Sequence, residues 1–361
     1  MAKKICIVLG TRPEIIKMSP VIRAFARRKA GFFIVHTGQH YSPELDRVFF
    51  RELKLPAPKY NLHAGSGTQA EQLGKMFKGL EAVFKKERPG IVLAEGDTNS
   101  VFAGAFVAKR LGIPVGHVEA GLRSYDERMP EETNRILTDH MSELLFAPTP
   151  ETKRILIKEG ISPSRIFVTG NTVVDAVRQN LKLAGARSRI LTDLGLERGD
   201  YLLATFHRAE NTDDRKNLKG IVDGLARAAR NLSMPVVVPL HPRTRKCLAK
   251  FRIRIPRELV ATRPVGYLDF LKLMENARLI LTDSGGIQEE ACVLKVPCVT
   301  LRENTERPET LAVGSNALGG TDPSRILRAA RKMMRRARRW RIPFGDGRAG
   351  EKIAGILKRK P

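Results

Sequence analysis

The chain contains little cysteine and no long apolar run. Its 361 residues include four cysteines, none in a CxxC pair: Cys6, Cys247, Cys292 and Cys298. No apolar stretch approaches the roughly 20 residues that a membrane-spanning helix needs, and residues 1–4 lead directly into the apolar run Ile5–Leu9 without the longer apolar core of a signal peptide. We therefore expect a cytoplasmic protein with reduced thiols, no disulfide framework, no metal site and no insertion into a membrane.

Acidic residues are also scarce relative to basic ones. The chain has 38 Asp and Glu against 64 Lys and Arg, a formal net charge of +26 at pH 7, and such an excess favours polyanionic partners. The densest basic run, 325–341, nevertheless predicts an amphipathic surface helix with solvated arginines, because its apolar residues recur at steps of three and four: Ile326, Ala330, Met333, Ala337 and Trp340. No zinc-finger spacing or aromatic RNA-binding motif accompanies the charge, so we do not expect nucleic acid as a partner.

Short apolar runs alternate with amphipathic stretches along the whole chain. The expected strands are Ile5–Leu9, Phe32–Thr37, Ile91–Ala94, Val115–Val118, Leu144–Ala147 and Ile166–Val168, then Tyr201–Thr205, Pro235–Leu240, Leu279–Thr282 and Val296–Leu301. This alternation predicts parallel sheets covered by helices, the α/β class. Because the chain exceeds what one core usually organises, we expect two Rossmann-like domains, 1–170 and 171–345, with the binding site in the cleft between them.

Carboxylates follow two of the expected strands in the first half. Asp97 and Glu119 come just after Ile91–Ala94 and Val115–Val118. The carboxyl ends of parallel strands form the ligand-binding edge of a sheet, so these acids are candidates for acid–base chemistry. Glu131 opens the next expected helix and is a third candidate. The alternative is that Asp97 caps a helix and Glu131 is an ordinary first-turn charge, whereas Glu119 would be costly to bury without a partner or a ligand.

Two strand-to-helix junctions have the features of an anion site. Arg12 and Lys17 lie in the expected helix that follows the first strand. Ser284–Gly286 follows Leu279–Thr282, and its glycines allow the backbone to approach a diphosphate at a helix N-terminus. Glu290, one turn later, is placed to reach ribose hydroxyls, and His207 ends another strand. The alternative is a Gly-rich turn with surface cations and a satisfied loop histidine.

Eight segments resemble one known family, the non-hydrolysing UDP-N-acetylglucosamine 2-epimerases. In chain order over residues 10–310 they are GTRPEIIKMSPVI, GDTNSVFAGAF, HVEAGLRS, MPEETNR, GNTVVDA, FHRAEN, LTDSGGIQEEA and NTERPET. The resemblance implies the glycosyltransferase-B fold, built from two Rossmann-like domains. It also implies a C-terminal helix, 346–361, that packs back on the N-terminal domain.

The resemblance further implies a reaction and a set of site residues. The reaction is the reversible conversion of UDP-N-acetylglucosamine to UDP-N-acetylmannosamine for polysaccharide biosynthesis, through elimination of UDP to 2-acetamidoglucal and re-addition. The implied catalytic residues are Asp97, Glu119, Glu131 and His207, and the implied substrate-binding residues are Arg12, Lys17, Phe270, Ser284, Gly285, Gly286, Glu290 and Arg307. UDP-N-acetylglucosamine and UDP are the expected partners of a homodimer without a cofactor, since no GxGxxG fingerprint follows the first strand.

Three other functions would use a similar site. A hydrolysing epimerase would release UDP and free N-acetylmannosamine, whereas the run Arg12–Lys17 is typical of the non-hydrolysing branch. A glycosyltransferase of the same fold could hold a UDP-sugar with Ser284–Gly286 and Glu290, but it would not need three acids at the sugar. A non-catalytic nucleotide-sugar sensor is the last alternative, and no feature of the sequence favours it.

Overall fold

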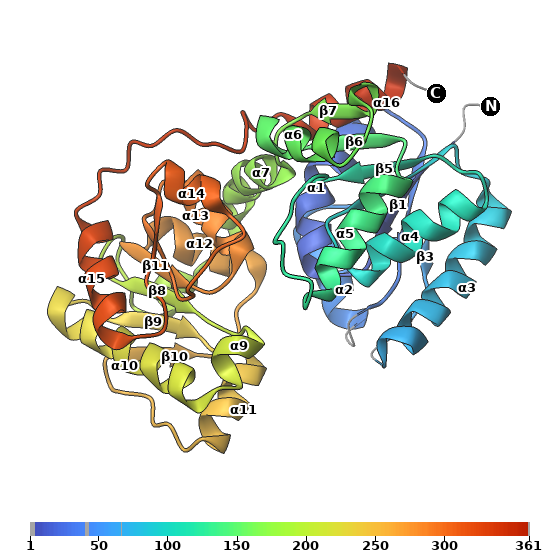
Figure 1. Ribbon diagram of the computed structural model, residues 1–361. Helices are drawn as coiled ribbons and strands as arrows, with labels where there is room; N and C mark the ends of the chain where they lie inside the picture. Colours follow the sequence, from blue (N-terminus) through green and yellow to red (C-terminus); the bar gives the residue numbers. More distant parts are fainter. Residues whose placement is uncertain (1–3, 40–42, 66, 360–361) are drawn as a thin grey trace. The chain divides into compact units, whose positions relative to one another are not determined.

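The computed structural model describes residues 4–39, 43–65 and 67–359, with only the backbone described for 43–47. The chain forms two α/β units (Figure 1). One unit comprises residues 1–179 and 344–361, and the other comprises 180–343. Each has a parallel sheet with helices on its faces, so the predicted fold class is confirmed.

The first unit is built on a seven-stranded parallel sheet. Its strand order is β3 (Tyr60–Asn61), β2 (Phe32–His36), β1 (Ile5–Leu9), β4 (Ile91–Glu95), β5 (Val115–Val118), β6 (Leu144–Ala147) and β7 (Ile166–Val168). Its helices are α1 (Arg12–Arg27), α2 (Pro43–Glu52), α3 (Gln69–Glu87), α4 (Asn99–Arg110), α5 (Pro130–Met141), α6 (Pro150–Lys158), α7 (Thr172–Arg187), which continues into the second unit, and α16 (Ala349–Arg359). In the centre of the sheet Ile7 pairs with Ile34 on one side and Leu93 on the other.

The second unit has a six-stranded parallel sheet. Its strand order is β10 (Leu259–Thr262), β9 (Val236–Pro239), β8 (Leu202–Thr205), β11 (Leu279–Thr282), β12 (Cys298–Thr300) and β13 (Asn316–Leu318). The helices are α8 (Ile190–Asp193), α9 (Ala209–Thr212), α10 (Arg215–Leu232), α11 (Pro242–Lys250), α12 (Tyr267–Asn276), α13 (Gly285–Leu294), α14 (Pro308–Ala312) and α15 (Pro323–Met334). The apolar helix faces bury both sides of this sheet in two core clusters.

Both sheets reverse their strand order at one point. The chain builds outward from β1 to β3 and then returns to place β4 beside β1, and it repeats this pattern with β8 to β10 and β11. At such a switch point the loops after the two central strands diverge to opposite faces, which leaves a crevice at their carboxyl ends. The loops after β1, β4, β8 and β11 are therefore the places where ligand-binding side chains are expected.

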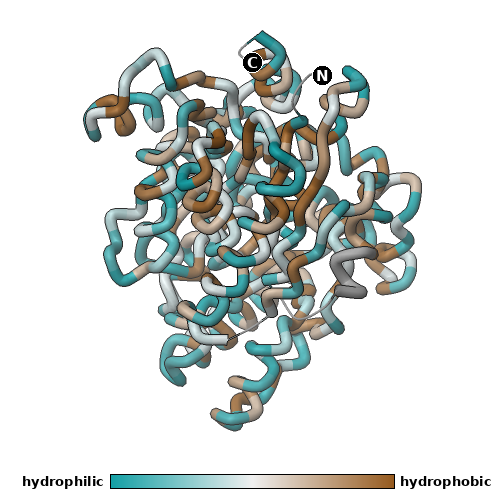
Figure 2. The backbone as a smooth tube through the Cα atoms, turned by 90° about the vertical axis from the view of Figure 1, so that its right-hand side faces the viewer, coloured by the Kyte–Doolittle hydropathy of each residue, from teal (hydrophilic) through white to brown (hydrophobic). Residues whose placement is uncertain are grey.

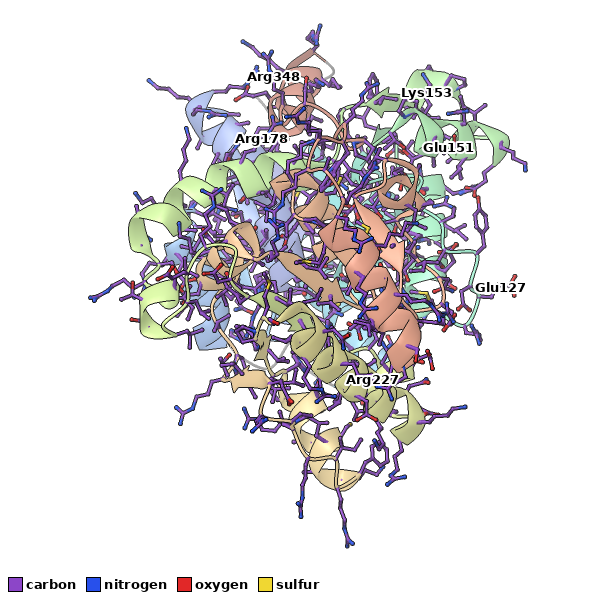
Figure 3. All side chains as sticks on the ribbon, turned by 90° about the vertical axis from the view of Figure 1, so that its left-hand side faces the viewer. Glu127, Glu151, Lys153, Arg178, Arg227 and Arg348 are labelled. Atoms are coloured by element: carbon purple, nitrogen blue, oxygen red, sulfur yellow. The ribbon has the colours of Figure 1, made fainter. Side chains whose placement is uncertain are left out.

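Apolar residues lie in the interior beside the sheets, and most charged residues lie on the outer helices and loops. Figure 2 shows brown, apolar segments along the interior strands, while the outer helices and loops are mainly teal and white. Charged side chains such as Glu127, Arg227 and Arg348 extend from the surface (Figure 3). Within the described residues, no helix combines the length and the apolarity that crossing a membrane demands.

The basic run 325–341 is only partly helical, which corrects one prediction. Helix α15 ends at Met334, and Trp340 lies beyond it, where its buried indole Nε1–H donates to the carbonyl of Cys292 at 3.0 Å. Ala337, predicted on the buried face, is exposed. Like charges three and four residues apart destabilise a helix, and residues 335–341 are mostly arginine, which explains the early end.

The C-terminal helix α16 packs against α1 within the first unit (Figure 1). The carboxylate of Asp175 accepts the backbone N–H groups of Ala349 and Gly350, at 3.1 and 3.0 Å, and thereby satisfies donors at the start of α16. A Cβ added at Gly350 would lie 2.8 Å from the backbone of Pro20 in α1. A glycine is therefore needed where the two helices meet.

We expect Gly350→Ala to lower the free energy of unfolding by about 1–3 kcal/mol, because the new methyl group would force α16 away from α1. The matched control is Gly355→Ala in the same helix, where an added Cβ has no neighbour within 4 Å. That variant should be unchanged or more stable by about 0.5–1 kcal/mol from helix propensity. Urea unfolding measures both, and equal stabilities of the two variants would contradict this packing.

Candidate functional site

Glu119 is held in an unusual environment directly after β5. Its backbone lies in the left-handed region, with φ of 71°, and only 5% of the residue is exposed. Both carboxylate oxygens lie 2.7 Å from Nζ of Lys17, and Asn171 Nδ2 donates to Oε2 at 3.1 Å. Left-handed backbone is costly for a residue other than glycine and is concentrated at functional sites. The carboxylate is therefore placed and charge-compensated at the carboxyl end of the sheet.

Lys17 joins Glu119 to a second buried acid. Its Nζ lies 3.2 Å from Oε1 of Glu95, the last residue of β4, whose side chain is 1% exposed. Burial raises the pKa of Glu95 well above its usual range, and the nearby carboxylates of Glu119 and Glu14 act in the same direction while Lys17 opposes them. One lysine thus stands between two carboxyl groups, one of which favours its protonated form, so the cluster is suited to holding or transferring a proton.

Glu14 adds a third carboxyl group in the first turn of α1. It accepts the backbone N–H groups of Gly10 and Thr11, at 2.5 and 3.3 Å, and the hydroxyl of Thr98 also donates to it. Burial raises its pKa from 4.5 to about 7, although these hydrogen bonds lower it. Glu14 therefore ties the loop after β1 to the loop after β4, across the switch point.

Asp97 belongs to a neighbouring ionic network. Its carboxylate pairs with the guanidinium of Arg135, which also contacts Glu132 at 2.7 Å. Glu132 is buried and accepts backbone N–H groups of Ser124 and Tyr125. The side chain of Asp97 remains 30% exposed, so it keeps access to solvent and to a ligand while Arg135 fixes its position.

Glu131 and Arg12 lie at the surface of the first unit. Glu131, beside the buried Glu132 in α5, is exposed. Arg12 is exposed at the start of α1, and its guanidinium carbon lies 5.2 Å from the centre of the Phe49 ring, within cation–π range. The structure therefore brings Lys17 and Glu119 together, with Asp97 two residues beyond Glu95, while Glu131 and Arg12 do not join that cluster.

In the second unit, Asp283 organises the switch point between β8 and β11. One of its oxygens accepts the backbone N–H groups of His207 and Arg208, at 2.9 and 3.0 Å, and also Asn211 Nδ2 at 3.0 Å. The other lies 3.6 Å from Nδ1 of His207. The His207 side chain is 42% exposed, so Asp283 orients an accessible imidazole beside Ser284.

Helix α13 begins at this point with two glycines. Ser284 is its N-cap, Gly285 and Gly286 form its first positions, and the first-turn N–H groups of a helix attract anions. A Cβ on Gly285 would lie 3.1 Å from Glu306 Oε2 and about 4 Å from the Arg307 side chain. The space beside Gly285 is therefore too small for a larger side chain, and the Arg307 guanidinium lies next to it.

The other expected nucleotide contacts surround the same helix. Nε of Arg307 lies 2.8 Å from Oε1 of the buried Glu289, which fixes the arginine against α13. The hydroxyl of Tyr267 donates to Glu290 at 3.4 Å. Phe270 in α12 is partly buried against the sheet core. Within the described residues, no group of three or more His, Cys, Asp or Glu side chains is arranged to hold a metal ion.

Sequence reasoning did not single out Glu14, Glu95, Asn171 or Arg135. Glu95 is the last residue of β4 and Asn171 lies three residues after β7, and these positions at strand ends were the available signal. Glu14 and Arg135 occur in helices, where a charged residue normally faces solvent. Their burial depends on contacts with residues far away in the sequence, so it could not be read locally.

Two α/β units, each with a parallel sheet, define the class as a glycosyltransferase-B fold; one carries a lysine–carboxyl cluster and the other a glycine-rich helix N-terminus. The family model described as UDP-N-acetylglucosamine 2-epimerase matches residues 23–358. The chain belongs to this family.

Individual relatives agree over almost the full length. The chain is 51% identical to the UDP-N-acetylglucosamine 2-epimerase of Methanocaldococcus jannaschii, over 98% of each chain. It is 40% identical to the UDP-2,3-diacetamido-2,3-dideoxy-D-glucuronate 2-epimerase of Pseudomonas aeruginosa, over 98% of this chain and 99% of that one. The crystal structure of the M. jannaschii enzyme in complex with UDP-GlcNAc and UDP matches with a TM-score of 0.91 at 52% identity, covering 99% of both chains.

The raised pKa of Glu14 should make stability depend on pH. A carboxyl group whose pKa is higher in the folded state contributes stability below its unfolded value, 4.5, and this contribution is lost as the pH rises to about 7. Between pH 5 and pH 8 the parent protein should therefore lose roughly 2–3 kcal/mol more unfolding free energy than Glu14→Gln. Urea titrations at both values test this, with exposed Glu127→Gln as the control. If Glu14→Gln shows the parent's pH dependence, Glu14 does not titrate as described.

Proposed function

We propose that this chain catalyses the reversible epimerisation at C2 of UDP-N-acetylglucosamine, giving UDP-N-acetylmannosamine. The observation that carries the proposal is the buried cluster of Glu119, Lys17 and Glu95. Family membership and the liganded structure of the M. jannaschii relative support the choice of substrate. Inverting a carbon centre requires that a proton leave one face and arrive at the other, and paired carboxyl groups supply this.

We propose the following division of roles in the first unit. C2–H has no adjacent carbonyl group to acidify it, so its proton must leave together with the UDP on C1. Glu119, whose two oxygens are fixed by Lys17, is the candidate base or acid on one side. Asp97, partly exposed and paired with Arg135, is the candidate on the other. Glu131 is not assigned to either face of C2, because it is exposed in the first turn of α5.

In the second unit, the N-terminus of α13 is the proposed site for the diphosphate. Its first N–H groups, Arg307 and the imidazole of His207 would stabilise the negative charge that develops as UDP departs. Glu290 would bind ribose hydroxyls and Phe270 would lie near the uracil. We further propose that the reaction is non-hydrolysing, so that 2-acetamidoglucal and UDP recombine. The expected homodimer stays a prediction.

The reaction can be tested with UDP-N-acetylglucosamine alone in heavy water. We expect UDP-N-acetylmannosamine with deuterium at C2 and no need for nicotinamide, because the proposed step passes the C2 proton to carboxyl groups that exchange their own protons with solvent. Product analysis by NMR distinguishes the alternatives, since free N-acetylmannosamine would show a hydrolysing enzyme. Retention of hydrogen at C2 would exclude the elimination step. Parallel incubation with UDP-2,3-diacetamido-2,3-dideoxy-D-glucuronate tests the substrate of the 40% identical relative.

The assignment of the acids predicts the effect of two conservative variants. Asp97→Asn and Glu119→Gln keep the size of each side chain and remove its titratable group. Each should bind UDP nearly normally and lose turnover by roughly 10²-fold or more. Glu127→Gln, on the exposed segment before α5, is the control and should turn over at the parent rate. If both Asp97→Asn and Glu119→Gln turn over at the parent rate, these acids have only structural roles and the catalytic assignment is wrong.

A further inference from the structure

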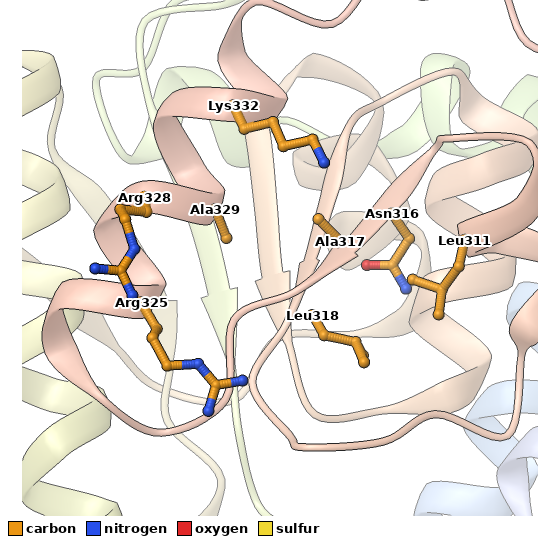
Figure 4. A pocket seen from close by; sticks show the side chains of 8 residues that line it. All are labelled: Leu311, Asn316, Ala317, Leu318, Arg325, Arg328, Ala329 and Lys332. Carbon is orange, nitrogen blue, oxygen red and sulfur yellow. The ribbon is translucent and has the colours of Figure 1, made fainter.

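An open pocket of about 450 Å³ lies at the edge of the second unit's sheet (Figure 4). This volume is within the range of about 300–1,000 Å³ typical of ligand pockets. Helix α15 supplies Arg325, Arg328 and Lys332 on one side. The remaining lining is mainly apolar and comes from α14, β13 and α15: Leu311, Asn316, Ala317, Leu318 and Ala329. None of these residues belongs to the proposed catalytic or nucleotide site.

The backbone of β13 is unpaired along this pocket. In the sheet order β13 is the last described strand and pairs only with β12. The carbonyl of Ser315 accepts from Cys298 N–H, and Gly319 N–H donates to Thr300, so the odd-numbered residues face β12. By the alternation of a parallel ladder, the N–H and C=O groups of Asn316 and Leu318 point outward. Both residues line the pocket, which therefore offers main-chain hydrogen bonds to an added strand.

The positive charge beside this edge is only partly compensated within the part of the chain that the structure describes. Arg325, Arg328 and Lys332 share one face of α15 at spacings of three and four. Arg325 pairs with Glu303 at 2.8 Å. Among the described residues, no carboxylate lies within ion-pair distance of Arg328 or Lys332, and both are exposed. Arg328 and Lys332 therefore lie beside the apolar lining of the pocket and the unpaired edge of β13.

We propose that this edge binds an extended acidic peptide segment of a partner protein, which adds as a strand beside β13. Main-chain bonds to Asn316 and Leu318 would give the register, as in other cases of strand addition. Carboxylates on the peptide would meet Arg328 and Lys332, and alternate apolar side chains would enter the floor formed by Leu318 and its neighbours. A second copy of this chain is disfavoured as the occupant of this edge, because pairing β13 with β13 of another copy would bring Arg328 and Lys332 close to the same cations of that copy.

The probe is a fluorescein-labelled peptide of eight residues that alternates Glu with Val, and binding to the full chain is measured by fluorescence anisotropy. Two peptide controls accompany it: Lys in place of Glu, and N-methylated alternate amides. We expect saturable binding of the Glu peptide, at least fivefold weaker binding of the N-methylated peptide, and no binding of the Lys peptide. Equal affinity for the N-methylated peptide would overturn strand addition.

The protein variants separate this pocket from general basic charge. The double variant Arg328→Ala, Lys332→Ala should bind the Glu peptide at least fivefold more weakly. The matched control Arg331→Ala, Arg335→Ala removes the same charge from the same helix end, outside the pocket, and should bind within twofold of the parent. Equal losses in both doubles, or no binding by the parent, would overturn the proposal. Sedimentation analysis adds the last outcome: if only the pocket double changes the oligomeric state, a second copy is the occupant and the acidic partner is excluded.

Discussion

The first unit depends on a single cation placed between buried carboxyl groups. Lys17 comes from α1, Glu95 from the end of β4 and Glu119 from the residue after β5, so the contact joins three segments across the sheet. Each group alone would be expensive to bury, and each is tolerated because the others compensate it. The same arrangement places the carboxyl group of Glu95, whose pKa burial raises, beside that of Glu119, which Lys17 contacts through both oxygens. The structural requirement and the proposed acid–base role are thus met by the same atoms.

The reversal of strand order explains why these groups meet. The loops after β1 and β4 lie at a switch point, and Glu14 connects them by accepting from Gly10 and from Thr98. The second unit uses the same topology with other chemistry. There Asp283 fixes the loops after β8 and β11, and the helix that follows offers its N-terminus rather than a carboxyl cluster. One fold pattern therefore holds a lysine–carboxyl cluster in one unit and a glycine-rich helix N-terminus in the other.

The edge of the second sheet at β13 differs from its centre, because its outer backbone groups have no strand partner among the described residues. At the central switch point polar groups are paired with one another, whereas β13 leaves the N–H and C=O groups of Asn316 and Leu318 unpaired within the described chain. Natural proteins commonly shield such edges with charge. Arg328 and Lys332 discourage pairing with another copy of this basic chain, and the same charges would select an acidic segment.

Local sequence determined the interior strands of the fold and the motifs by which the chain resembles its family. The expected runs at β1, β5, β6, β7 and β11 match the observed strands. Strands β1, β6 and β11 lie inside their sheets, where a strand covered on both faces is largely apolar, whereas β7 is a partly exposed edge strand that still carries an apolar run. Edge strands β10 and β13 were not predicted, since they are short and half exposed and show no such run. The helical period of 325–341 predicted a helix that is too long, because the like charges after Met334 end α15 at that residue. Tertiary structure alone decided which acids are buried and which cation compensates them: Lys17 and Glu119 are 102 residues apart, and their contact arises only when the sheet brings the helix and the strand end together.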